Sequence, residues 1–300
     1  MNILLENLDR VKTTELGVER IRRNKHQKDI EEILSHRHDL GADYWTTPDH
    51  RLMKGSPFSA YDCALMLLDL GLDPSHPILK TVSDLFFSQW REDGRFKIYP
   101  TGGILPCHTA YVASFLCKMG YQSDERIQRT FQYFLETPYK DGGWRCNKFS
   151  YGRGPETEYS NPLPTLNVLD AFRFSDYCNT EPALDRAMEF LLEHWVIKTP
   201  IGPCQYGIGS RFMKIVYPVW DYNLLNYVYV LSFYNKARKD ERFLSALEAL
   251  ESKLINGQLM VERISPKLSK LDFCRKGQPS ELLTKKYKEI VENISVEVKK

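Results

Sequence analysis

Hydrophobic and polar positions follow two helical patterns along this chain. The segment AYDCALMLLDL (60–70) is apolar almost all round, whereas ERIQRTFQYFLE (125–136) gathers Ile127, Phe131 and Phe134 on one face. An all-apolar helix is buried on every side, and an amphipathic helix keeps one face in solvent. The sequence therefore predicts an inner layer and an outer layer of helices.

The two patterns recur along the chain at a spacing of 49 residues. Under this shift the matching pairs are Ala64 and Ala113, Leu67 and Leu116, Gly71 and Gly120, Ile78 and Ile127, Thr81 and Thr130, and Leu85 and Phe134. Each unit contains a helix, a break at glycine, a second helix and a turn. Such self-similarity is typical of arrays of helix pairs. We expect units at 59–96, 108–144, 165–202 and 222–259.

Shorter helical segments flank the array. One helix is expected at about 26–38, and a closing helix is expected at 279–294, after Pro279-Ser280. No segment shows a persuasive alternation with a period of two residues, so strands are not expected. The prediction is an all-α fold with a helical lead-in at 1–25 and a single domain at 26–300.

The turns of two units carry a family resemblance. Gln89–Phe96 reads QWREDGRF, and Glu136–Trp144 reads ETPYKDGGW, with Glu for Gln and one extra residue. These turns resemble the Q-x-x-x-D-G-x-aromatic turn of terpenoid cyclases and protein prenyltransferase β subunits. The resemblance covers about 26–294 and implies an α/α toroid of about five inner and outer helix pairs around a central cavity. It also implies that each turn aromatic, such as Trp144, packs on a neighbouring repeat.

Charge and cysteine content narrow the class of protein. The 41 Lys and Arg residues nearly balance 39 Asp and Glu residues, which gives no electrostatic case for binding nucleic acid. No window is apolar enough for a membrane span, and the first residues do not have the pattern of a secretory signal. Seven cysteines without C-x-x-C spacing predict free thiols and a cytoplasmic protein.

The loops that lead into the inner helices hold most of the chemically distinctive residues. They span 50–59, 102–108, 144–165 and 202–222, and the last two are unusually long. The candidates for contact with a substrate are Trp144, Tyr159, Tyr206, Arg211, Tyr217 and Trp220. An aromatic pocket with a few polar groups suits an apolar, isoprenoid-like small molecule. Alternatively, these aromatic side chains simply fill the ring.

The resemblance also indicates where an acid would lie. Cyclases of this type protonate an alkene with a D-x-D-D-T-A or D-C-T-A-E motif, but residues 106–110 read PCHTA here. Thr-Ala is present and the acidic residues are not, which argues against cyclisation started by protonation. Four catalytic candidates remain: Cys107, His108, Asp62 and Asp221. The structural alternatives are a paired or solvated Asp62 and a helix cap at Asp221.

Zinc is the metal that the resemblance suggests. Prenyltransferases hold it through D-x-C and a His that precedes Thr, and here His108-Thr109 matches while Asp62-Cys63 is only an adjacent pair. Thiolate and imidazole ligands suit zinc. The candidate ligands are His108, Cys107, Cys146 and Cys204. The alternative is a hydrogen-bonded histidine at a helix start and cysteines that pack as small apolar residues.

Two functions of different class follow. The first is an enzyme that acts on an isoprenoid or similar apolar substrate in a central cavity. The second is a non-catalytic ring that binds an apolar ligand or a protein partner. Other α/α rings cleave polysaccharides with paired carboxylates, but no such pair stands out in this sequence.

Overall fold

The computed structural model describes residues 25–295, so the lead-in expected at 1–25 lies outside the described residues except for Lys25. This part of the chain is mostly helical, with a few very short strands, which confirms the helical prediction at that level. Its helices are α2 (Gln27–Ser35), α3 (Ala60–Asp69), α4 (Pro77–Phe87), α5 (Pro106–Lys118), α6 (Glu125–Glu136), α7 (Pro162–Phe172), α8 (Pro182–Ile197), α9 (Leu224–Leu231), α10 (Asn235–Arg238), α11 (Glu241–Glu251) and α12 (Glu281–Ser295). Two 3₁₀ segments, Pro155–Glu158 and Pro266–Leu268, lie in the connections.

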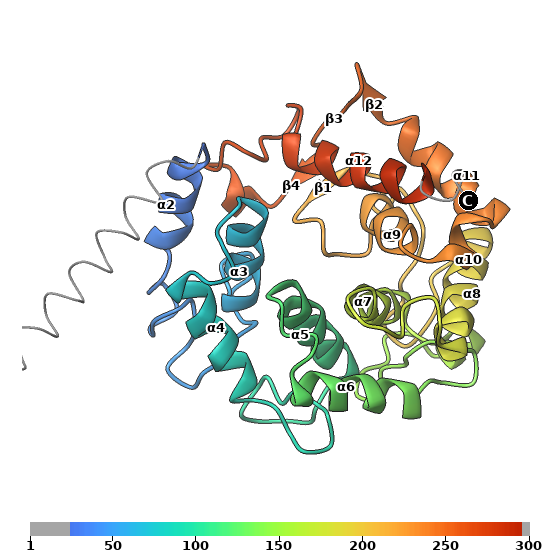
Figure 1. The fold of residues 1–300 in the computed structure, drawn as a ribbon, viewed down its shortest axis with the longest axis horizontal. Helices are drawn as coiled ribbons and strands as arrows, with labels where there is room; N and C mark the ends of the chain where they lie inside the picture. Colours follow the sequence, from blue (N-terminus) through green and yellow to red (C-terminus); the bar gives the residue numbers. More distant parts are fainter. Residues whose placement is uncertain (1–24, 296–300) are drawn as a thin grey trace, which may run out of the picture.

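The helices occupy two layers, as the hydrophobic pattern predicts. Figure 1 shows α3, α5, α7 and α9 nearer the middle and α4, α6, α8 and α11 around them. Every residue of α7 and α9 is buried, whereas α6 buries only Ile127, Thr130, Phe131 and Phe134. Packing joins α5 to α7, α7 to α8 and α9, and α9 to α12. Burial of the apolar inner helices supplies the main driving force for this arrangement.

The same backbone contact occurs at both Asp-Gly turns. The backbone N–H of Phe96 donates to Thr109 Oγ1 at 3.2 Å, and that of Trp144 donates to Thr165 Oγ1 at 3.0 Å. Both threonines belong to the inner helix that follows the turn. The turn after each outer helix is therefore tied to the next inner helix.

The glycine of each turn lies against the next outer helix. Gly94 and Gly142 have φ angles of +86° and +93°, which glycine adopts without strain. A Cβ atom at Gly94 would lie 2.7 Å from the carbonyl oxygen of Arg129, and one at Gly142 would lie 2.8 Å from that of Arg186. Both the backbone angle and the close approach therefore require glycine at these positions.

Contacts connect the region of α2 with the start of α12 and the segment before it. Asp29 of α2 accepts hydrogen bonds from the backbone N–H groups of Asp272 and Phe273, at 2.6 and 3.2 Å. Lys25 pairs with Glu281 at 2.7 Å. Segments more than 240 residues apart in sequence thus lie side by side.

The strands are a difference from the sequence prediction. β1 (Val216–Tyr217) pairs in parallel with β4 (Arg263–Ile264), and β2 (Leu254–Ile255) pairs antiparallel with β3 (Gln258–Leu259). Two-residue strands are too short to show a period in sequence. A turn at Asn256-Gly257 joins β2 to β3, with positive φ angles of 51° and 74° at its two residues.

No helix within 25–295 is long and apolar enough to cross a lipid bilayer.

Candidate functional site

A cavity of ≈ 470 Å³ lies where the N-terminal end of α3 meets the segments 211–223 and 263–266. The parallel pairing of β1 with β4 holds these two segments together. Asn223 caps α9 by accepting from the N–H of Asn226 at 3.0 Å, and it donates to the carbonyl of Val219 at 2.9 Å. These hydrogen bonds fix the segment before α9 as a wall of this cavity, which we name the first cavity.

Asp62 is a buried carboxylate on the lining of this cavity. Its Oδ2 accepts from the Ser59 hydroxyl at 2.6 Å, and its Oδ1 accepts from the indole N–H of Trp220 at 3.1 Å. Burial raises the pKa of Asp62 above its ordinary value, although Ser59, Ser56 and Trp220 act in the opposite direction. Both oxygens of Asp62 are therefore occupied by donors from the chain itself.

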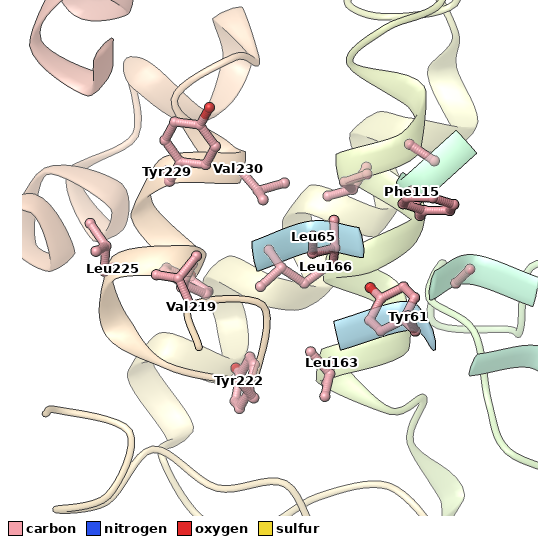
Figure 2. Packing of buried hydrophobic residues seen from close by; sticks show 14 of the residues in the cluster. Tyr61, Leu65, Phe115, Leu163, Leu166, Val219, Tyr222, Leu225, Tyr229 and Val230 are labelled. Atoms are coloured by element: carbon pink, nitrogen blue, oxygen red, sulfur yellow. The ribbon is translucent and has the colours of Figure 1, made fainter. Parts of the chain in front are cut away.

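Aromatic side chains form much of the remaining wall. Tyr61 lies edge-on to Tyr111 at 5.4 Å between ring centroids and to Trp220 at 6.4 Å, and Tyr217 contacts Trp220 at 5.8 Å. Tyr222 completes this wall. Figure 2 shows Tyr61 and Tyr222 among the buried hydrophobic side chains, on separate segments of the chain. The wall combines flat apolar faces with a few hydroxyl groups.

Arginines and an aspartate line the more open part of the cavity. Arg211 pairs with Asp221 at 3.4 Å, with side chains 74% and 51% exposed. Arg263 also lines the cavity and is exposed. An exposed pair of this kind contributes little to stability, so its donors remain available to a ligand.

Five of the predicted site residues line this cavity together: Asp62, Arg211, Tyr217, Trp220 and Asp221. Three predicted substrate contacts, Trp144, Tyr159 and Tyr206, do not line it. Trp144 is buried, and its indole N–H donates to the carbonyl of Phe134 at 3.2 Å, so it holds a turn against the preceding helix α6. Tyr159 is 40% exposed. Tyr206 contacts the ring of Tyr222 edge-on at 5.8 Å.

The predicted cysteine cluster forms in part. Cys204 lies beside Cys146, and its interaction with the Cys146 thiol holds the pKa of Cys146 below its usual range. Asn161 positions Cys204 through its Nδ2, 3.2 Å from the sulfur, and through its Oδ1, which accepts from the Cys204 N–H at 3.3 Å. All seven cysteines lie in the described part of the chain and are free, as predicted.

The residues of 25–295 contain no group of three or more His, Cys, Asp or Glu side chains that could hold a metal ion. The expectation of zinc at His108, Cys107, Cys146 and Cys204 is therefore corrected, because the chain does not arrange these donors as a ligand set. Burial instead raises the pKa of Cys107 to about 12 and lowers that of His108 to about 4, so both are neutral near pH 7. His108 lies with its ring 5.2 Å from that of Tyr99.

Some lining residues were missed by the sequence interpretation. Tyr61 and Tyr111 lie within apolar helices, where aromatic residues are expected as core, and Arg263 lies in a segment without any distinctive motif. The position of Arg263 in the sequence does not indicate that it lines the cavity, because only the pairing of β1 with β4 brings it there.

The sequence matches no protein-family model and no curated protein. The resemblance to terpenoid cyclases and prenyltransferases therefore remains a prediction that rests on the turns and on the helical pattern.

Proposed function

We propose that residues 25–295 form an α/α toroid of the terpenoid cyclase and prenyltransferase type, and that its first cavity binds an isoprenoid-like small molecule without transforming it. Three observations support the ring: the two layers of helices, the matching contacts at the two Asp-Gly turns, and the hydrogen bonds of Asp29 that connect the two ends of the array.

The observation that carries the binding function is the wall of the first cavity. Tyr61, Tyr111, Tyr217 and Trp220 present aromatic faces in a space of ≈ 470 Å³. This volume lies within the range of pockets that enclose small organic ligands, and such pockets are lined mainly by apolar and aromatic groups. Arg211 and Arg263 would meet an anionic head group at the more open side.

The state of the carboxylates favours binding over catalysis. A general acid needs a proton directed at the substrate. Asp62 instead accepts hydrogen bonds at both oxygens, from Ser59 and Trp220, and Asp221 is exposed and paired with Arg211. The other two catalytic candidates, Cys107 and His108, do not line the cavity. None of the four is therefore placed to protonate or attack a bound ligand.

Tryptophan fluorescence tests this proposal directly. We expect farnesyl diphosphate and farnesol to change the emission saturably, with tighter binding for the diphosphate because of the two arginines. Trp220→Phe should abolish most of the change, because Trp220 lines the cavity. Trp90→Phe is the matched control: the Trp90 indole N–H is buried without an acceptor among the described residues, and this side chain does not line the cavity.

The outcomes separate the two functional classes. No saturable change with either probe, or an equal loss of signal in Trp220→Phe and Trp90→Phe, would contradict binding in this cavity. Release of diphosphate, or a new hydrocarbon product detected by mass spectrometry, would contradict the proposal that the ligand is bound without being transformed. It would instead support the hypothesis that the protein is an enzyme.

A further inference from the structure

A second cavity, of ≈ 270 Å³, lies at the C-terminal ends of α3, α5 and α7. The first cavity uses the other end of α3, where Ser59, Tyr61 and Asp62 are found, whereas the second uses Leu68 and Asp69. Trp220 and Tyr229 contribute to the second cavity from the segment before α9 and from α9 itself. We propose that this second cavity binds an organic carboxylate with a short apolar tail.

Partly buried cations are the feature that points to an anionic ligand. The lining contains the cations Lys118, Arg173 and Lys286 and the carboxylates Asp69 and Asp170. Glu289, whose carboxylate accepts from the Tyr229 hydroxyl at 2.7 Å and acts on both Arg173 and Lys286, balances the third positive charge from just outside the lining. The side chains of Lys118, Arg173 and Lys286 are 23%, 11% and 18% exposed. Charged groups at this depth are stabilised by partners for their donors, so a donor without an acceptor in the chain favours an anionic ligand.

Asp170 is already saturated by the chain. Its carboxylate accepts from the Ser114 hydroxyl and the Lys118 ammonium group, and from the Nε of Arg173 at 2.7 Å. Burial alone would raise the pKa of Asp170, but Lys118 and Arg173 outweigh burial and hold it below its ordinary value. The charge of Lys118 is thereby used within the protein, whereas Arg173 and Lys286 are less completely engaged.

Arg173 keeps donors that have no acceptor in the described part of the chain. Its Nε bonds to Asp170, and neither Nη group has an acceptor among residues 25–295. The rings of Phe174 and Phe233 lie 4.1 and 4.4 Å from the guanidinium carbon and fix its plane. A planar guanidinium with two free Nη groups matches the geometry of a carboxylate.

Lys286 of α12 faces the same space. Its Nζ lies 3.4 Å from Asp69 Oδ1 and 4.9 Å from the ring centroid of Tyr229. Asp69 also accepts from the Tyr217 hydroxyl at 3.1 Å, so it shares its charge between two donors. Burial opposes the charge on Lys286, but Asp69 outweighs burial with a further contribution from Glu289, and the pKa of Lys286 is raised, so the ammonium group is charged near pH 7.

The rest of the lining sets the ligand class. Leu65, Leu68, Leu72 and Val219 give an apolar wall opposite the cations. The two Nη groups of one guanidinium suit a monocarboxylate better than a phosphate ester, which carries about two negative charges at neutral pH. A monocarboxylate with a few methylene groups satisfies both the charged and the apolar side.

The competing explanation is a purely structural network. Cations near helix C-termini stabilise the helix dipole, and Lys118 and Arg173 lie at the C-terminal ends of α5 and α7. Lys286 lies in the middle of α12 and has no such role. It is therefore the residue whose replacement distinguishes a ligand site from a network that only stabilises the fold.

Isothermal titration calorimetry with sodium hexanoate tests the proposal on the full chain. We expect one saturable site, with affinity reduced about tenfold or more in Lys286→Gln, because a charge-assisted hydrogen bond is lost. Lys285→Gln is the matched control, since Lys285 is an exposed neighbour on α12 that does not line the cavity. Arg263→Gln, in the first cavity, should leave hexanoate binding unchanged. Thermal unfolding of each variant checks that the fold is retained.

Four outcomes would overturn the proposal. They are no saturable binding of hexanoate to the wild-type chain, equal losses in Lys285→Gln and Lys286→Gln, equal affinity for hexan-1-ol, and tighter binding of inorganic phosphate. If Lys286→Gln unfolds, Lys286→Met and ¹³C-carboxyl hexanoate replace it: the labelled carboxyl resonance should shift on binding to the wild-type chain and should not shift with a folded Lys286→Met variant.

Discussion

Gly142→Ala is the substitution whose effect the structure defines most sharply. Gly142 has φ of +93°, and an added Cβ would lie 2.7 Å from Arg186 Cβ and 2.8 Å from the Arg186 carbonyl carbon and oxygen. Left-handed backbone costs a non-glycine residue about 1–2 kcal/mol. Forcing α8 away from the turn adds about 1–3 kcal/mol, as for other overpacked sites. We therefore expect a loss of about 3 kcal/mol in the free energy of unfolding.

Gly120→Ala provides a matched control because it measures only the cost of placing a non-glycine residue in left-handed backbone. Gly120 has φ of +89°, but nothing lies within 4 Å of the position of a Cβ atom. Its loss should be about 1 kcal/mol. Urea denaturation followed by circular dichroism measures both, and in thermal scans the two losses should appear as about 6 °C and about 2 °C. Equal losses in the two variants would refute the argument that the turn glycine is held against the next outer helix.

Three further predictions concern individual side chains. Because burial raises the pKa of Asp62 in the folded state, its contribution is greatest at low pH and is lost as the pH rises through the folded pKa; the melting temperature of the wild type relative to Asp62→Asn should therefore be higher near pH 4 than at about pH 8. A wild-type advantage that grows with pH would contradict this sign. Asp170→Asn should lose about 3–5 kcal/mol of unfolding free energy at neutral pH, since it leaves two buried cations without a counterion. The deficit should shrink in acid, because the depressed pKa of Asp170 stabilises the wild type only above that pKa. Exposed Asp176→Asn should change little in the same denaturation series, and an equal loss there would refute the reasoning. Trp144→Phe should lose about 1 kcal/mol with its hydrogen bond to Phe134, and ligand-dependent fluorescence should persist unless Trp144 is a substrate contact after all.

The helical pattern was predictable from sequence because burial imposes it residue by residue. The apolar stretch that begins after Ser59 becomes α3, and Ser59 caps it by accepting from the N–H of Asp62. The expected helix start near Thr165 is Pro162 in the structure, because proline is well suited to the first turn of a helix. Helix boundaries depend on such local chemistry, which the apolar pattern alone does not contain.

The site was predictable only where one continuous loop supplies its residues. Arg211, Tyr217, Trp220 and Asp221 come from a single long loop, and Asp62 follows a recognisable helix start. The second cavity was missed, since its charged residues lie on helices far apart in sequence.

The pairing of Lys118 with Asp170 spans 52 residues and depends on how α5 packs against α7. The sequence did contain one signal of the second cavity. It is the charged residue Asp170 within the otherwise apolar inner helix PLPTLNVLDAF. The identity of its partner cannot be read from spacing, because packing between two inner helices decides it.

Trp220 belongs to both cavities, so its position affects binding in each of them. Its side chain lines both, and its indole N–H is bonded to Asp62 on one side. A ligand that displaces this ring from either side changes the shape of the other space. Thermodynamic linkage then requires reciprocity: if an occupant of one cavity alters affinity in the other by some factor, the second occupant alters the first by the same factor. The indole of Trp220 would thus be a wall common to both cavities, and through it two different ligands would compete or cooperate.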